Sequence, residues 1–257
     1  MADQFVSGDL KDRVAVVTLN NPPANVLSHA VLAELDRTFD QLERDDAVRV
    51  VVLTATGRFF CLGADIKELA MLTKAQQGAD LSVRGQALLN RIERLDKPVI
   101  AAINGTCLGG GLELVMACHM RVAATGLQLG LPEIKLGLIP GFGGTQRLPR
   151  IIGPSKAAEL ILTGESISSD EALGLGLVNR TVPADRVLPE ALDLARQVAM
   201  KGPSAIQAAL RAIRTGLDSP LADGLSREAD LFGSLCETPD KQEGTTAFLE
   251  KRPPRFS

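Results

Sequence analysis

The 257-residue sequence has few aromatic residues: they make up 3% of the chain, with no tryptophan and no tyrosine. Nucleic-acid sites commonly stack bases on aromatic side chains, so a platform of that kind is not expected. The formal net charge is -3, which gives no general excess of the positive charge that phosphate backbones attract. These two deficits predict that nucleic acid is not a partner.

Residues that commonly bind metals are also scarce. The chain has four cysteines and two histidines, and the cysteines show no paired short spacing. The six residues are Cys61, Cys107, Cys118, Cys236, His29 and His119. A zinc site is therefore not predicted. We interpret the cysteines as small buried apolar residues of a protein from a reducing compartment.

Long apolar runs are missing as well. The N-terminal MADQF lacks a basic segment and an apolar run, and no later stretch reaches the roughly 18 apolar residues of a membrane span. The sequence therefore predicts no membrane association. We expect a cytoplasmic protein, or one of the mitochondrial matrix if a transit peptide has been removed.

The first half of the chain alternates between two patterns. β-rich runs occur at 13–23, 48–57, 97–111 and 120–126, and apolar residues at helical spacing occur at 29–45 and 78–95. The run at 48–57 is nearly continuously apolar, as in a strand covered on both faces. Strand–helix alternation predicts an α/β fold with mostly parallel pairing, and the strand runs resemble a loose internal repeat of ββα turns.

Beyond about residue 142 the patterns predict successive helices. We expect them at 143–151, 154–162, 168–174, 185–200, 203–216 and, with interruptions, 220–250. No linker or low-complexity segment separates the two parts. We therefore predict a sheet-bearing core with the active site at 1–190 and a helical C-terminal region at 191–257, packed together.

Several common catalytic motifs are missing from the sequence. There is no G-x-x-x-x-G-K-[ST] phosphate loop and no G-x-S-x-G nucleophile elbow. The segment GFGGTQR (141–147) resembles a dinucleotide loop only superficially, because its third glycine falls in the wrong place. Glycine-rich turns and carboxylates are the remaining candidates for chemistry.

The segment NGTCLGGGLELVMA (104–117) combines three glycines with one acid in an apolar run. If PVIAAI is a strand and LELVMA opens a helix, Gly109 to Gly111 form the turn between them, and a ligand can approach their backbone closely. Amides at a helix N-terminus favour negative charge. Glu113 in the first helical turn is also a common, mildly stabilising structural choice, so this segment alone does not decide its role.

Two further segments strengthen the catalytic interpretation. GRFFCLGADIKEL (57–69) follows the preceding strand at the equivalent place, so Ala64 could offer a second N–H. Two such donors form an oxyanion hole for a carbonyl oxygen. Glu133 lies in LGLPEIKLGLIPGFGGTQRLPR (129–150), again among apolar residues. A solvated or salt-bridged acid is the alternative, but two such acids suit acid–base chemistry beside a polarised carbonyl.

Taken together, these segments resemble the crotonase superfamily, and specifically enoyl-CoA hydratase, over nearly the whole chain. The matching segments, in order, are FFCLGADIKEL, AAINGTCLGGGLELVMACHMRVAA, LGLPEIKLGLIPGFGGTQRLPRIIG and FLEKR. The combination, order and spacing are highly specific. Leu62 and Val26 depart from the pattern, since a smaller residue is common at both positions, where the CoA adenine pocket is expected. The resemblance implies a spiral of ββα repeats with a helical C-terminal region.

The resemblance also implies roles for individual residues. Ala64 and Gly110 match the amides that hold the thioester oxygen, and Glu113 and Glu133 match two catalytic acids that flank one water. Gly141 matches a backbone contact to that water. The positions that match CoA contacts are Ala24, Val26, Ala64, Asp65, Ile66, Lys67, Phe232, Phe248 and Lys251. Lys251 suits the CoA phosphates as a point charge.

By this resemblance we expect reversible hydration of a trans-2-enoyl-CoA to a 3-hydroxyacyl-CoA, without a metal or other cofactor, because CoA arrives with the substrate. A Δ3,Δ2-enoyl-CoA isomerase is the nearest alternative, and having both acids favours the hydratase. An RNA-binding hydratase homologue is a second alternative, which the acidic balance disfavours. The resemblance further implies a homotrimer or a hexamer built as a dimer of trimers through the C-terminal helices.

Overall fold

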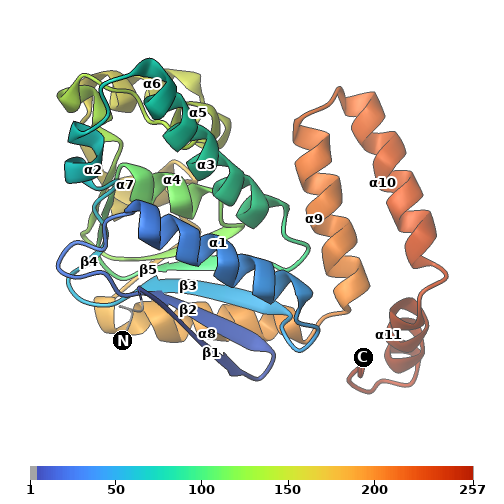
Figure 1. Cartoon of the computed structure of the whole chain (residues 1–257). Helices are drawn as coiled ribbons and strands as arrows, with labels where there is room; N and C mark the ends of the chain where they lie inside the picture. The colour runs from blue at the N-terminus through green and yellow to red at the C-terminus, as the bar shows by residue number, and fades with distance from the viewer. Residues whose placement is uncertain (1–4, 257) are drawn as a thin grey trace.

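The computed structural model describes residues 5–256, so most of the N-terminal MADQF segment and residue 257 lie outside the described residues. An α/β body carries a separate arm of helices at its C-terminal end (Figure 1). The larger sheet has six strands in the order β1-β2-β3-β5-β7-β10. They are β1 (Val6–Lys11), β2 (Val14–Leu19), β3 (Val50–Ala55), β5 (Val99–Ile103), β7 (Met120–Ala124) and β10 (Arg180–Val182). All neighbours are parallel except β1 and β2.

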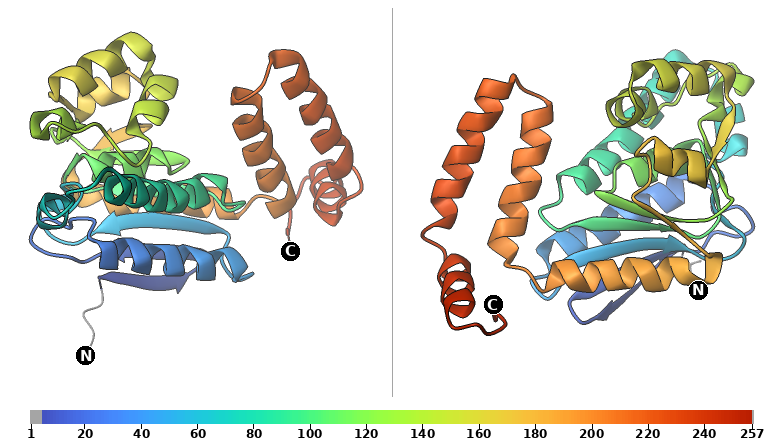
Figure 2. Two further views of the ribbon diagram at one scale, coloured as in Figure 1. Left: turned by 45° about the horizontal axis from the view of Figure 1, so that its top comes forward. Right: turned by 180° about the vertical axis from the view of Figure 1, so that it is seen from behind.

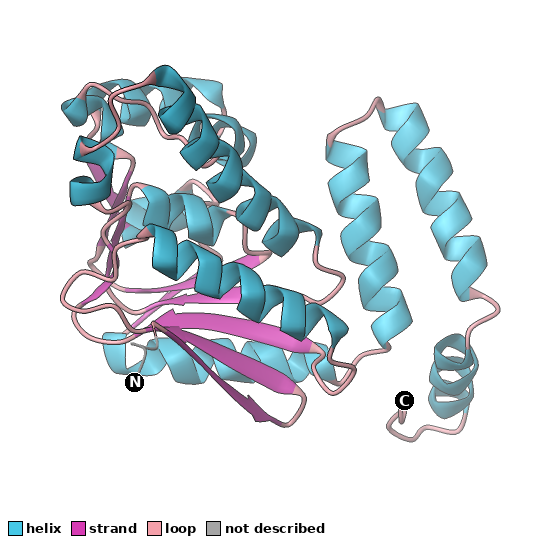
Figure 3. Ribbon diagram, in the orientation of Figure 1, coloured by secondary structure: helices cyan, strands magenta, loops and turns pink. Residues whose placement is uncertain are grey.

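A smaller sheet has four strands in the order β4-β6-β8-β9, and only β8 and β9 are antiparallel. Its strands are β4 (Phe59–Cys61), β6 (Thr106–Leu108), β8 (Gln128–Gly130) and β9 (Ser166–Ser168). The chain alternates between the two sheets, because β3 leads to β4, β5 to β6 and β7 to β8. Figure 3 shows the strands as magenta arrows. This alternation confirms the predicted repeat of ββα turns.

Helices cover both faces of the larger sheet. The helices of the body are α1 (His29–Arg44), α2 (Ile66–Ala70), α3 (Ala75–Arg94), α4 (Gly110–Met116), η1 (Pro132–Leu136), α5 (Gly144–Ile152), α6 (Pro154–Thr163), α7 (Ser169–Gly174), η2 (Ala184–Arg186) and α8 (Val187–Ala199). In α1, Ser28 caps the first turn by accepting a hydrogen bond from Val31 N. The apolar face of α1 is buried, while α8 packs on the opposite side of the sheet against β2, β3, β5 and β7 (Figures 1 and 2).

The core is centred on two strands, β3 and β5, whose residues are all buried. This confirms that the apolar run at 48–57 is a strand covered on both faces. Three of the cysteines, Cys61, Cys107 and Cys118, are buried as expected. The prediction was wrong for Cys236, which is exposed on the C-terminal arm because that part of the chain has few neighbours to cover it.

The C-terminal arm consists of α9 (Pro203–Leu217), α10 (Leu221–Leu235) and α11 (Pro239–Leu249). α9 packs along α10 and touches α11, and the arm stands away from the body in both views of Figure 2. The expected division at residue 190 falls inside α8, and the two-part organisation stays a prediction.

Two sequence expectations were incomplete. The stretch after residue 142 contains two short strands, β9 and β10, where only helices were predicted, because strands of three residues carry almost no periodic signal. Strand β1 was also missed, since only Val6 of its residues is buried. Across residues 5–256, no helix is long and apolar enough to cross a membrane.

Candidate active site

A cavity of about 1220 Å³ lies between the body and the first helix of the arm. Its lining comes from α2, α3, α4, η1, α5 with the segment before it, and α9. Both acids singled out in the sequence, Glu113 and Glu133, line it together with Ala64 and Gly110. The structure therefore gathers four predicted site residues around one cavity.

The smaller sheet explains why these residues meet. Strands β4, β6 and β8 are parallel neighbours, so their carboxyl ends lie along one edge. Ala64 follows β4, Gly110 follows β6 and Glu133 follows β8. Three successive ββα turns thus each deliver one group to the same edge, as carboxyl ends of parallel strands do in other α/β sites.

Gly109 and Gly111, two of the three consecutive glycines, are needed for different structural reasons. Gly109 has φ 52° and ψ -131°, a conformation that side-chain-bearing residues rarely adopt. A Cβ added to Gly109 would lie 3.1 Å from Oε1 of Glu133, and one added to Gly111 would overlap Cys61. These glycines start α4 close to β4 and to the second acid, although the predicted turn is modified because β6 lies between β5 and the glycines.

The amides of Ala64 and Gly110 are adjacent and unpaired. An added Cβ on Gly110 would lie 3.5 Å from the Ala64 nitrogen, and one on Gly63 would lie 3.4 Å from the Gly110 nitrogen. Within residues 5–256, neither N–H donates a hydrogen bond. Gly110 is the first residue of α4, where the helix leaves its N–H groups free and adds a partial positive charge. Two free donors on neighbouring turns of the chain can hold one oxygen atom.

Glu113 is fixed by backbone donors although it is only 2% exposed. Its Oε1 accepts hydrogen bonds from Phe142 N at 2.8 Å and from Gly144 N at 2.7 Å. Among the described residues, its other carboxylate oxygen accepts none, so that oxygen can serve a ligand in the cavity. In Glu133, Oε2 is buried without a hydrogen-bond partner among the described residues.

Burial raises the pKa of both acids above the ordinary range. For Glu113, removal from water and the nearby Glu133 raise the pKa to about 7, although the two backbone N–H groups and Arg147 lower it. For Glu133, removal from water raises the pKa. An acid with a pKa of about 7, as in Glu113, can exchange protons near neutral pH, which general acid–base groups need.

Two of the segments expected to contact CoA lie side by side. Leu27 pairs with Ala64 as an isolated parallel bridge, and Leu62 N donates to Ala24 O at 3.0 Å. The first segment, 24–27, includes Val26. The second segment, 62–67, continues into α2, which begins at Ile66 and is capped by Asp65. Ile66, on the second segment, also lines the cavity. These contacts place the predicted positions 24, 26 and 64–67 on one rim of the molecule.

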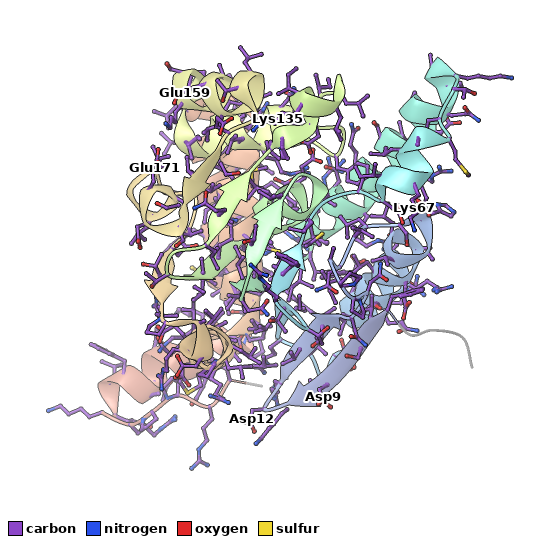
Figure 4. The ribbon with its side chains drawn as sticks, turned by 90° about the vertical axis from the view of Figure 1, so that its left-hand side faces the viewer. Asp9, Asp12, Lys67, Lys135, Glu159 and Glu171 are labelled. Carbon is purple, nitrogen blue, oxygen red and sulfur yellow. The ribbon has the colours of Figure 1, made fainter. Side chains whose placement is uncertain are left out.

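Lys67 is on this rim as well. It is exposed on α2, and Figure 4 shows it on the opposite side of the picture from Glu171. By contrast, Phe232, Phe248 and Lys251 lie on the arm, where all three are exposed, and none of them lines the cavity. The single chain does not bring these three residues to the rim of the active site.

Sequence reasoning missed the donors that hold Glu113. The segment GFGGTQR was compared with a dinucleotide loop, and only its Gly141 was given a role by the resemblance, but its Phe142 and Gly144 amides bind the carboxylate. Gly141 lines the cavity, and its carbonyl accepts a hydrogen bond from Gln86 Nε2 at 2.9 Å. Its expected contact with a water stays a prediction. The available signal was the spacing of Gly141, Gly143 and Gly144, which suits backbone donors.

Solved structures share this fold over almost their full length. The crystal structure of an enoyl-CoA hydratase from Bacillus anthracis superposes with a TM-score of 0.94 at 42% identity, covering 98% of this chain and 99% of that one. The spiral of ββα repeats with its C-terminal helices is therefore the crotonase fold, as the sequence predicted.

The family follows from sequence comparison. The model of the family described as "Enoyl-CoA hydratase/isomerase" matches residues 9–257. A Bacillus subtilis protein named "Probable enoyl-CoA hydratase" is 49% identical over 95% of both chains. The "Crotonyl-CoA hydratase" of Syntrophomonas wolfei is 40% identical over 100% of this chain and 99% of its own length. This chain belongs to the enoyl-CoA hydratase/isomerase family.

Proposed function

We propose that the protein catalyses the reversible hydration of trans-2-enoyl-CoA to 3-hydroxyacyl-CoA. The observation that carries the proposal is that the buried Glu113 and the half-buried Glu133 line one cavity together with two free amides. Relatives named for hydration of crotonyl-CoA and of other enoyl-CoA thioesters support the same reaction.

The amides of Ala64 and Gly110 polarise the thioester carbonyl. As water adds to the β-carbon, negative charge develops on this oxygen, because electrons of the conjugated double bond move toward the carbonyl. Fixed N–H donors stabilise that charge without reorganising, and removing one such donor typically lowers the rate by about 10²–10³. The positive end of α4 adds to the effect.

The two acids divide the proton transfers between them. The free oxygen of Glu113 orients a water molecule and takes its proton as the hydroxyl adds to the β-carbon. Glu133, in its acid form, gives a proton to the α-carbon. The product gains one water in total, while a proton has moved from Glu133 to Glu113 and must return before the next turnover.

The raised pKa values suit this division of labour. A pKa of about 7 lets Glu113 take up a proton near neutral pH, and the raised pKa of Glu133 favours its acid form. Burial of the partnerless Oε2 of Glu133 favours the protonated state there. The two N–H donors favour the charged state of Glu113, which the base requires.

The presence of both acids favours hydration over Δ3,Δ2 isomerisation. An isomerase needs one group to move a proton between two carbons, whereas hydration also needs a base for water. Two backbone donors hold one oxygen of Glu113 and leave the other free, which supports a role as the base. We propose no metal or redox cofactor for the reaction, because the oxyanion hole supplies the charge stabilisation and CoA arrives with the substrate.

We also propose that the active unit is a trimer or a dimer of trimers. Ile213, Leu217, Leu221, Phe232 and Phe248 are 64–83% exposed on the arm, which is more apolar surface than a solvated helix pair needs. Docking of the arm onto a second copy would cover these side chains. It could also carry Phe248 and Lys251 to the CoA rim of a neighbouring active site, which the single chain does not achieve.

The proposal is tested by following the loss of the conjugated enoyl-thioester absorbance with purified protein and crotonyl-CoA, and then with longer acyl chains. Product analysis should show the 3-hydroxyacyl-CoA, and the same equilibrium should be reached from that side. Absence of turnover with every chain length, while 3-enoyl-CoA is converted to the conjugated isomer, would assign the site to isomerisation instead.

A further inference from the structure

The segment that holds Glu113 is itself held by a buried arginine. Arg147, in the first turn of α5, is 9% exposed and donates from three nitrogens. Nη1 donates to Phe142 O at 3.1 Å, and Nη2 donates to Asn90 Oδ1 and to Glu93 Oε2, each at 2.7 Å. Nε donates to the same Glu93 oxygen at 3.2 Å. A guanidinium group offers this fixed fork of donors, and no other side chain does.

Phe142 connects this arginine to the acid. Its N–H donates to Glu113 Oε1 at 2.8 Å, while its carbonyl accepts the hydrogen bond from Arg147. A displacement of Arg147 therefore moves the peptide groups that hold the carboxylate. The second donor to Glu113, Gly144 N, belongs to the same helix as Arg147.

Helix α3 supplies the side chains that anchor Arg147 and the segment before α5. Gln86, Asn90 and Glu93 are spaced four and three residues apart, so they lie on one face of α3. Gln86 holds the Gly141 carbonyl, and the other two hold Arg147. Next to Gln86 in the sequence, Gly85 is buried against the Phe142 ring, which a Cβ at that position would overlap.

We propose that Arg147, anchored to Asn90 and Glu93, is a positioning residue that fixes the Phe142 and Gly144 amides on Glu113. This inference rests on the proposed function, in which Glu113 is the base. Arg147 also lines the cavity, and we expect it to act through these two amides rather than by touching substrate. Loss of the anchor would let the amides drift, so that the carboxylate loses both its orientation and two donors that favour its charged form.

The charged groups that face Glu113 are Glu133 from η1 and Arg147 from α5, and Arg147 lowers the pKa of Glu113. Arg147→Gln should therefore lower kcat by about 10- to 100-fold, the size expected for a small misplacement. It should also move the acid limb of the pH–rate profile to higher pH, with KM little changed. Arg147→Lys keeps a charge but not the fork, so it should restore the profile only in part.

A second variant separates the anchor from a direct charge effect. Glu93→Ala removes a negative charge, which by charge alone would lower the pKa of Glu113 and move the limb to lower pH. Release of the anchor predicts a shift to higher pH. The matched control is Arg91→Gln on the same helix, which breaks ion pairs with Asp36, Asp40 and Glu43 but leaves the segment before α5 untouched.

The experiment combines these profiles, measured with crotonyl-CoA, with hydrogen–deuterium exchange of peptides that cover residues 140–148. Arg147→Gln and Glu93→Ala should speed exchange there and shift the limb upward, while Arg91→Gln should do neither. Parental exchange and a parental limb in both variants would overturn the inference, as would a downward shift in Glu93→Ala. A parent without turnover would refute the proposed function, whereas the exchange comparison would still decide whether Arg147 holds the segment.

Discussion

Replacing Glu113 by glutamine should change activity and stability in opposite directions. In the parent, Phe142 N and Gly144 N donate to Glu113 at 2.8 and 2.7 Å. The side-chain amide of Glu113→Gln keeps a carbonyl oxygen that can accept both hydrogen bonds. It cannot take a proton from water. We expect hydratase turnover to fall by at least about 10²-fold, the low end for a positioned acid–base group.

The stability effect follows from the raised pKa. The pKa of Glu113 is about 7 in the folded chain, against an ordinary value of 4.5. Between these values the folded state holds a proton that the unfolded state has released, so the free energy of unfolding falls as the pH rises. A difference of about 2.5 units corresponds to roughly 3 kcal/mol of lost stability above pH 7. Glutamine carries no such proton, so Glu113→Gln should escape this loss.

The assay is thermal unfolding of the parent and of Glu113→Gln at fixed protein concentration, from pH 5 to pH 8. The melting temperature of the variant should rise relative to that of the parent across this range, and the difference should reach several degrees at pH 8. The control is Asp9→Asn, which removes an exposed carboxylate on the edge strand β1, where Figure 4 labels it. That variant should keep a constant difference in melting temperature from the parent.

Two results would refute the reasoning separately. Hydration of crotonyl-CoA by Glu113→Gln at the parental rate would remove Glu113 from the chemistry. A melting-temperature difference between Glu113→Gln and the parent that does not change with pH would show that the pKa of this acid is not raised. Loss of hydration with retained isomerisation of 3-enoyl-CoA would instead support separate roles for the two acids.

Other substitutions test the remaining parts of the site. Glu133→Gln should lower turnover at least about 10²-fold in the same absorbance assay, and parental turnover would contradict its role as the acid. Gly110→Val should abolish activity, measured as kcat/KM, since a branched side chain fills the approach to the amide. Ala64→Gly keeps its N–H and should lower activity only mildly. A larger loss of activity in Ala64→Gly than in Gly110→Val would exclude this oxyanion hole. Lys251→Ala should raise KM for CoA esters with kcat largely kept, and light scattering at micromolar concentration should find a trimer or hexamer rather than an active monomer.

Much of the fold could be predicted from the sequence because its signals are local. The expected helix at 29–45 is α1 (His29–Arg44), and its buried Val31, Leu35 and Phe39 follow the helical spacing. The expected start at Ser168 is a true N-cap, whose hydroxyl accepts from Glu171 N. Such patterns depend on neighbours three or four residues apart, which a sequence displays directly.

The second sheet could not be predicted in the same way. Strands β4, β6 and β8 have three residues each and pair across about 20–50 positions of the chain, so no local pattern marks them. This sheet sets the geometry of the site, because it aligns the turns at Ala64 and Gly110 with η1 and Glu133. The sequence named these residues, but their meeting at one sheet edge is a property of long-range pairing.

The hydrogen bonds that hold Glu113 in place could not be predicted from a residue-by-residue resemblance. Arg147 and Glu93 are 54 positions apart, and neither stands out in composition or spacing. Their connection to catalysis passes through the carbonyl and N–H of Phe142. Every residue has these backbone groups, so a comparison of side chains does not reveal their role. A carboxylate that is 2% exposed needs donors to stay charged. In this fold the requirement is met by backbone N–H groups that a buried guanidinium group holds in place, so the base depends on residues of α3 that need not contact the substrate.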